Sequence, residues 1–136
     1  MDQQSDFWRH IREDMTVTLA TAAEDRVTMR LVSPVAYAGG VLIFTSAASV
    51  KYRQLRENPQ ACLAAGPYFA EVTAAFHGPC MAAENAPLRA AYSAKFADAF
   101  AEGVSFGGRE SDFILLRPTR LSGWLADGSA PFDLAL

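Results

Sequence analysis

The sequence predicts an α+β protein in which six short strands form an antiparallel barrel flanked by helices. Three observations lead to this fold class. The chain has 136 residues, of which 51% are hydrophobic and 20% are charged, as expected for one globular domain over residues 1–136. More segments show the two-residue periodicity of strands than show helical periodicity. Strands and helices also do not alternate one to one, as they would in a doubly wound parallel sheet.

The first segment, residues 2–14, predicts an amphipathic helix. Phe7, Trp8 and Ile11 fall on one face of this helix, and an apolar face of this kind packs against a core. We therefore expect the helix to cover the core of the barrel.

A hairpin is predicted next, from strands at residues 15–22 and 27–35 that are joined by a polar turn. Because strand side chains alternate between two faces, Arg30 points away from the face that carries Met29. Pro34 has no N–H group for a sheet ladder, so the end of the second strand lies at an edge or a bulge.

The other strands follow from apolar runs bounded by turn residues. Gly39 and Gly40 predict a tight turn before a strand with apolar residues on both faces. These strands are predicted at residues 41–45, 60–65, 70–83 and 112–124.

Two more helices are predicted between these strands. One lies within residues 46–58 and is ended by Pro59. The other covers residues 85–100, where one apolar stripe is formed by Leu88, Tyr92, Phe96 and Phe100. Residues 126–136 are interpreted as a tail.

Composition excludes several functions. The net charge of −3 provides no basic patch, so neither a nucleic acid nor an anionic membrane is an expected partner. Cys62 and Cys80 stand singly rather than in C-x-x-C pairs, so no metal site is predicted. No segment is apolar over the length of a membrane span and the start does not resemble a signal peptide, so we expect a cytoplasmic protein.

The segment from Phe44 to Lys51 carries the strongest chemical signal. It joins a strand end to a helix start and contains the hydroxyl residues Thr45, Ser46 and Ser49. The first N–H groups of a helix have no internal partner, so such a start suits an anion. A lysine in the first turn is unfavourable by itself, which favours a phosphate beside Lys51. The same residues also fit a simple helix cap with a solvated lysine.

Two residues outside this segment are further candidates. Arg30 could reach the same anion with its forked guanidinium group, and its alternative reading is a surface arginine. Trp124 could stack on a ligand, or pack in a core or a dimer contact. The sequence lacks the motifs G-x-G-x-x-G, G-x-x-x-x-G-K-[ST], H-E-x-x-H and G-x-S-x-G, so the residues alone lead to a barrel with a candidate phosphate site.

Three stretches, in this order and spacing, resemble the pyridoxamine 5′-phosphate oxidase-like FMN-binding split-barrel family. They are Arg30-Leu31-Val32, Phe44-Thr45-Ser46 followed by Ser49-Val50-Lys51, and Leu55-Arg56-Glu57-Asn58-Pro59. The resemblance covers most of the chain. It implies a six-stranded split β-barrel that forms a homodimer, with two FMN sites at the subunit interface that are each built from both chains.

The resemblance also implies which residues bind the cofactor. Lys51 and Arg30 would hold the FMN phosphate, and Ser49 belongs to the same cofactor site. The residues implied to line the isoalloxazine ring are Leu31, Val32, Ser33, Thr45 and Ser46. Thr73 and Trp124 would reach the flavin of the other subunit. No catalytic acid or base is named, because electron transfer is the chemistry of the flavin itself.

Two departures from the family oxidase narrow the expected activity. Val50 stands where that oxidase has an arginine, which removes one phosphate contact. Residues 126–136 contain neither arginine nor histidine, whereas the tail of the oxidase uses both to hold the phosphate of its substrate. Oxidation of pyridoxamine phosphate is therefore not expected. The helix predicted at residues 85–100 is closer to the general-stress-protein branch of the family.

The resemblance therefore implies an FMN-dependent oxidoreductase that acts on a small molecule, with NADH or NADPH as electron donor. Two alternatives stay open. The barrel could use a deazaflavin in place of FMN, or it could be a non-catalytic carrier or sensor of a flavin or a tetrapyrrole.

Overall fold

The computed structural model describes residues 2–100, 111–123 and 131–136. Its helices are α1 (Gln3–Glu13), α2 (Val50–Glu57) and α3 (Ala86–Lys95), with a short 3-10 helix η1 (Ala83–Asn85) before α3. Its strands are β1 (Val17–Ala23), β2 (Arg26–Val32), β3 (Val35–Tyr37), β4 (Gly40–Ser46), β5 (Gln60–Ala65), β6 (Tyr68–Pro79), β7 (Ser111–Gly123) and β8 (Phe132–Ala135). The described chain is α+β, as the sequence predicts.

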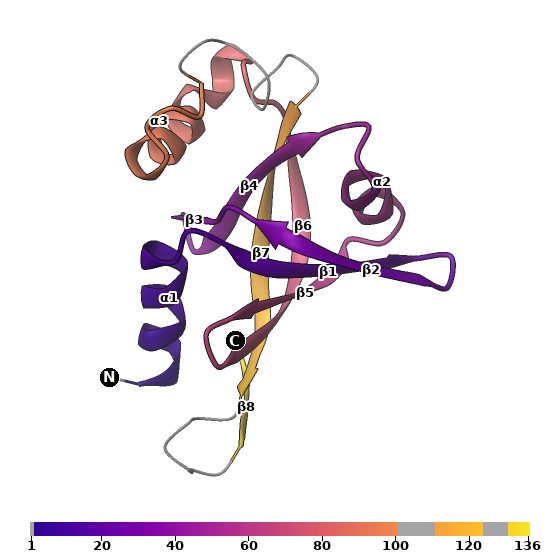
Figure 1. Cartoon of the computed structure of the whole chain (residues 1–136), viewed down its shortest axis with the longest axis vertical. Helices are drawn as coiled ribbons and strands as arrows, with labels where there is room; N and C mark the ends of the chain where they lie inside the picture. Colours follow the sequence, from indigo (N-terminus) through magenta and orange to yellow (C-terminus); the bar gives the residue numbers. More distant parts are fainter. Residues whose placement is uncertain (1, 101–110, 124–130) are drawn as a thin grey trace.

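All eight strands of the described residues pair in one antiparallel sheet. The strand order is β2-β1-β5-β6-β7-β4-β3, and β8 pairs with β7 beside this path. The strands β6 and β7 run through the length of the molecule, while the β1–β2 hairpin projects to one side near α2 (Figure 1). The sheet curls, so that Leu19 of β1, Ile43 of β4 and Ile114 of β7 reach the same core.

The six predicted strands are all present, and β3 and β8 raise the number in the described part of the chain to eight. Pro34 divides the predicted strand at 27–35, because a proline cannot donate to a sheet ladder. The chain pairs with β1 up to Val32 and resumes pairing at Val35, with β4 as the new partner. β8 lies in the segment interpreted as a tail. It has only four residues and its side chains are mostly exposed.

The strands β4 and β7 separate two cores. The main core contains Val41 and Ile43, and the second core contains Leu42, because neighbouring strand residues face opposite sides. This confirms the prediction that the strand at 41–45 is apolar on both faces. The helices α1 and α2 close the main core with Phe7, Ile11 and Leu55, and α3 covers the second with Leu88 and Tyr92.

The helix α1 begins at a side-chain cap. The carboxylate of Asp2 accepts a hydrogen bond from the N–H of Ser5 at 2.7 Å, which satisfies one of the unpaired donors of the first turn. Phe7 and Ile11 are fully buried, and Trp8 packs against the same core. The predicted apolar face of this helix is confirmed.

The helix α3 is shorter than the predicted helix at 85–100. It ends at Lys95, and Phe96 has the non-helical angles φ −117° and ψ 79°. Asn85 does not cap the helix with its side chain, since its amide nitrogen donates to the carbonyls of His77 and Pro79, each at 2.8 Å. The predicted aromatic stripe still packs together beyond the helix, where Phe100 lies 6.1 Å from the ring of Tyr92.

None of the helices in the described residues has both the length and the apolar character that crossing a bilayer requires.

Candidate functional site

Arg30 lies on β2 with its side chain folded across the neighbouring strand. Its guanidinium group donates to the carbonyl oxygen of Leu19 at 3.0 Å and to the hydroxyl of Thr21 at 2.9 Å. It also donates to the hydroxyl of Thr28. The predicted alternation is confirmed, because Arg30 is half-buried while Met29 is exposed on the other face. Burial lowers the pKa of Arg30 from its usual value, so the guanidinium group is not a freely solvated surface charge.

A buried glutamine of α2 orients the two hydroxyl groups that receive Arg30. Thr21 and Thr28 each donate a hydrogen bond of 2.6 Å to the amide oxygen of Gln54. Since a hydroxyl has one hydrogen, both oxygens then present lone pairs to the guanidinium group. The amide nitrogen of Gln54 donates to the carbonyl of Arg26 at 3.2 Å. These bonds fix α2 against the β1–β2 hairpin.

Sequence reasoning missed this threonine and glutamine cluster. The sequence feature that could have indicated the cluster is the position of Gln54. This residue follows Lys51 by three positions on the same predicted helix, so the two side chains lie near each other on the helix surface. Gln54 has only 7% of its surface exposed. A buried amide must find partners, but the sequence does not show that those partners belong to the hairpin.

The entrance of α2 is capped by Ser49. The hydroxyl of Ser49 accepts the N–H of Tyr52 at 3.2 Å and lies 3.1 Å from the hydroxyl of Thr45. The hydroxyl of Ser46 accepts the N–H of Ala48 at 3.1 Å. The predicted helix start is confirmed, and the capping role foreseen for these hydroxyls is present. When Thr45 donates to Ser49, the Ser49 hydrogen stays available for another acceptor.

Lys51 is a half-buried cation that has no counter-ion among the described residues. It makes no hydrogen bond or ion pair within residues 2–100, 111–123 and 131–136. Burial lowers the pKa of Lys51, and the positive charge of Arg30 lowers it further. This second cause places the two cations within electrostatic reach of each other. No carboxylate of the described chain pairs with either of them.

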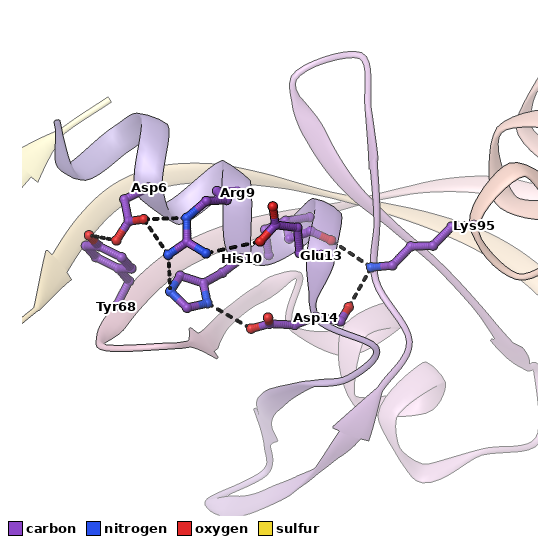
Figure 2. Close-up of polar contacts among 8 residues, drawn as sticks. Asp6, Arg9, His10, Glu13, Asp14, Tyr68 and Lys95 are labelled. Atoms are coloured by element: carbon purple, nitrogen blue, oxygen red, sulfur yellow. Dashed lines mark hydrogen bonds and ion pairs between the residues drawn. The ribbon is translucent and has the colours of Figure 1, made fainter. Parts of the chain in front are cut away.

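Lys95, in contrast, is a lysine whose ammonium group has all of its hydrogen-bond partners within the described chain. Its ammonium group donates to the carbonyls of Ile11 at 2.8 Å, Asp14 at 2.6 Å and Pro34 at 2.8 Å. Figure 2 shows this group reaching the C-terminal end of α1, close to Asp14, whose side chain contacts His10. The Asp6–Arg9 ion pair lies nearer the start of the same helix. Lys51 has no such set of acceptors among the described residues.

The arrangement of Arg30 and Lys51 can bind a dianion such as a phosphate monoester. Two positive charges held together in a partly dry place repel each other, and one doubly charged ligand offsets this repulsion. The N–H groups of Val50 and Lys51 lie in the first turn of α2, where a helix has no internal acceptors. These donors fit a phosphate.

The residues predicted to line a flavin ring do not all point to this place. The side chain of Leu31 lies on the face opposite Arg30 and is 66% exposed, and Val32 is buried in the main core. Thr45 is buried and bonded to Ser49. Ser33 follows the end of β2, and its carbonyl accepts the hydroxyl of Tyr92 at 2.8 Å. Leu31 and Val32 could therefore contact a ligand beside Arg30 only with their backbone groups.

Thr73 lies on the outer face of the sheet, away from the main core. Its hydroxyl donates to the side chain of Gln60 at 3.3 Å. Trp124, the other residue expected to reach a second flavin, lies outside the described residues. The proposed roles of both residues stay predictions.

This outer face of the sheet is apolar where β2 forms its edge. Val27, Met29 and Leu31 are 73%, 69% and 66% exposed. Met29 pairs with Ala20 of β1, which pairs in turn with Cys62 of β5. Directly paired residues of antiparallel strands share a face, so small side chains adjoin this exposed row. A contiguous apolar patch of this kind marks an interaction surface.

The fold and the paired cations together define a small α+β protein with a candidate phosphate site at a strand–helix junction. Comparison with known proteins then identifies its family. The family model described as pyridoxamine 5′-phosphate oxidase matches residues 3–125. The chain therefore belongs to the pyridoxamine 5′-phosphate oxidase family, as its sequence resemblance implied. No match was found among curated proteins.

Solved structures show the same fold. The General Stress Protein 26 of Bacillus anthracis matches with a TM-score of 0.71 and 15% identity, covering 100% of both chains. HutZ, the heme storage protein of Vibrio cholerae, matches with a TM-score of 0.70 and 17% identity over 87% of this chain and 91% of its own. A heme binding protein of Mycobacterium smegmatis gives 0.73 and 19% over 99% of this chain and 59% of its own.

Proposed function

We propose that the chain binds FMN, with the phosphate between Arg30 and Lys51, and that it is a flavin-dependent oxidoreductase. One observation carries the proposal: Lys51 is half-buried beside a second cation and has no counter-ion in the described chain. A buried charge without a partner costs free energy. A phosphate dianion at this place offsets that cost.

The hydroxyl and backbone donors at the start of α2 support the same ligand. Ser49 has a hydrogen available when Thr45 donates to it. The first-turn N–H groups add partial positive charge on the same side. Val50 contributes only its backbone, because it has no charged side chain. We therefore expect FMN affinity to depend strongly on Lys51 and Arg30.

The strand that carries Arg30 also provides a path for the flavin ring. Three residues of extended chain, from Arg30 to Ser33, cover about 10 Å. A phosphate at Arg30 thus allows the rest of the cofactor to run along the backbone of Leu31, Val32 and Ser33. When bound, FMN supplies the electron-transfer chemistry, and the protein holds and orients it.

A second copy of this chain is the partner we propose for the apolar outer face. Val27, Met29 and Leu31 present large apolar side chains there, and covering them removes apolar surface from water. Thr73 lies on the same face of the sheet, so a partner docked on this face would meet it. This placement supports the expected role of Thr73 toward the flavin of the other subunit.

A titration of the purified protein with FMN, followed by flavin fluorescence, tests the cofactor proposal. Lys51→Ala is expected to weaken FMN binding about 10- to 100-fold, since a hydrogen bond to a charged group is lost. Arg53→Ala is the matched control, because Arg53 is an exposed cation of the same helix. Riboflavin lacks the phosphate and should bind both variants equally. Wild-type protein that ignores FMN would contradict the proposal.

A second candidate is a non-catalytic carrier of a flavin or a tetrapyrrole. It is favoured by the structural similarity to HutZ and to the Mycobacterium smegmatis protein, which are described as heme proteins. Steady oxidation of NADH or NADPH by the FMN-loaded protein supports the enzyme. A bound flavin that is never reduced, or tight heme binding in a Soret-band titration, supports the carrier. Competition between FMN and a deazaflavin separates the remaining alternative.

A further inference from the structure

A cavity of about 420 Å³ lies beneath α3 and the residues that follow it. Ser33 forms one wall, and Tyr92, Phe96 and Asp98 form others. The cavity has the size of ligand pockets in proteins. It does not include Arg30 or Lys51, so it is separate from the phosphate site.

Two polar groups of this cavity are already engaged, and its one carboxylate among the described lining residues, on Asp98, is exposed to solvent and repels an anion. The three hydrogens of the Lys95 ammonium group are used by three carbonyl oxygens. The hydroxyl of Tyr92 donates to the carbonyl of Ser33 at 2.8 Å, and burial raises the pKa of Tyr92, which keeps it neutral. The described residues that line the cavity thus provide no available cation. A phosphorylated or carboxylated ligand would find no counter-charge there.

The other walls of the cavity are apolar and partly aromatic. Met15, Ala97 and Ala99 contribute small or flexible apolar surface. The ring of Phe96 lies 5.2 Å from the ring of Tyr92, with an angle of 31° between the two planes. Such tilted aromatic surfaces favour a planar ring as a neighbour.

The cavity adjoins the place where the flavin ring would end. Ser33 is both a cavity wall and the last of the residues along which we expect the cofactor to run. It stands three residues from Arg30, or about 10 Å along the extended chain. A molecule in the cavity would therefore lie next to the ring rather than next to the phosphate.

We propose that this cavity is the substrate site and that it takes an uncharged aromatic compound of one or two rings. The role as substrate site rests on the flavin site proposed above, whereas binding in the cavity does not. A neutral aromatic ring buries its surface against Phe96 and leaves no charge unpaired. An anionic ring of the same size loses its hydration without a compensating partner.

The test uses a matched pair of compounds on the protein without FMN. Menadione is a neutral two-ring quinone, and 1,2-naphthoquinone-4-sulfonate is a related quinone with a negative charge. Titration calorimetry is expected to show at least tenfold tighter binding of menadione. Equal affinities for the two compounds, or no binding of menadione, would overturn the proposal. Because FMN is absent, this result does not depend on the cofactor site.

Two variants place the compound in the cavity. Ala97→Trp fills the cavity from its wall and is expected to weaken menadione binding at least tenfold, and Ala97→Leu should have a smaller effect if the tryptophan disturbs folding. Ala90→Trp is the control, since Ala90 is exposed on α3 outside the lining residues. Unchanged binding in both Ala97 variants would refute the location.

A final measurement links the cavity to the flavin. In FMN-loaded wild-type protein, menadione should shift the flavin absorbance bands, and the Ala97→Trp variant should retain FMN without this shift. A failure of FMN to bind would contradict the cofactor proposal alone. FMN binding with a shift that survives in Ala97→Trp would contradict the cavity proposal alone.

Discussion

The ammonium group of Lys95 lies 2.6 Å from the carbonyl oxygen of Asp14, so the last residue of α3 caps the end of α1. The carbonyls of a final helical turn have no internal donors, and a cation at this end also complements the helix dipole. The same ammonium group binds the carbonyl of Pro34, between β2 and β3. One side chain thus connects three segments that are distant in the sequence.

Replacing this lysine should destabilise the fold. Lys95→Met keeps most of the side-chain volume but leaves three carbonyls without their donor, and we expect a loss of about 2 kcal/mol in the free energy of unfolding. Urea denaturation monitored by circular dichroism measures it. Lys51→Met is the matched control, because Lys51 has no partner in the described chain and its removal relieves repulsion with Arg30. An equal loss in both variants would show that the three carbonyl contacts are not the cause.

Substitutions of Gln54 separate two effects on FMN binding: the stability of the folded site and the charge near Arg30. Gln54→Leu removes the acceptor of Thr21 and Thr28, so we expect a loss of about 1–3 kcal/mol in stability together with weaker FMN binding. Gln54→Glu retains an acceptor for both hydroxyls, but it loses the donor to the carbonyl of Arg26 and adds a negative charge near Arg30. It should therefore lose some stability but still fold, and it should bind FMN more weakly.

Thermal melting and FMN titration of the two Gln54 variants provide the comparison. A Gln54→Glu protein that is stable and binds FMN as tightly as the wild type would show that the phosphate does not lie near Arg30. That outcome would leave the folding role of Gln54 intact.

A charge placed on the outer face should prevent dimer formation. Met29 is 69% exposed on β2, so Met29→Glu is expected to fold normally but to behave as a monomer, because the carboxylate would be buried in an apolar interface. Light scattering at micromolar concentration measures the mass. Met81→Glu is the control, as Met81 is also exposed, at 46%, but precedes η1. A wild-type monomer would contradict the proposed partner directly.

The hydrogen bonds of the Asp6 carboxylate predict how the free energy of unfolding depends on pH in acid. The hydroxyl of Tyr68 donates to it at 2.6 Å, and this bond is the largest cause of the lowered pKa of Asp6, followed by the bond from Arg9. A carboxyl whose pKa is lower in the folded state contributes stability above its ordinary value of 3.8. This contribution is lost as the pH falls through the folded value. Burial and the bond to Asp6 raise the pKa of Tyr68 to about 12, so the donor stays protonated.

Tyr68→Phe removes the donor and should raise the pKa of Asp6 toward 3.8. A carboxyl titration by nuclear magnetic resonance would show the shift, and the stability of the variant should depend less on pH below about 4. Tyr37→Phe serves as the comparison, since no hydrogen bond joins Tyr37 to Asp6 in the described chain. The same Asp6 titration curve in wild type and Tyr68→Phe would contradict this account.

Local periodicity predicted much of the fold. The alternation in the second strand placed Arg30 and Met29 on opposite faces, and the apolar residues at 41–45 indicated a strand that is buried on both faces. Each of these features depends only on the order of residues within one strand, and this order can be read directly from the sequence. The start of α2 was likewise visible from Ser49 and the hydroxyl residues before it.

Long-range contacts account for what the sequence did not show. The aromatic stripe predicted a helix through Phe100, but the helix ends where Lys95 turns toward the carbonyls of α1. The partners of Gln54 lie on strands 26 and 33 residues away. β8 forms its ladder with the end of β7, from Arg120 to Gly123. Each of these outcomes depends on a segment that local patterning does not identify.

The strands β4 and β7 belong to both cores at once, since Leu42 and Ile43 are adjacent residues that face opposite compartments. Neither core can therefore unfold alone, because its unfolding would disrupt the strands against which the other core packs. We expect the described chain to melt in a single cooperative step. Backbone amides of this shared pair should be the slowest to exchange with deuterium, at a rate set by global unfolding.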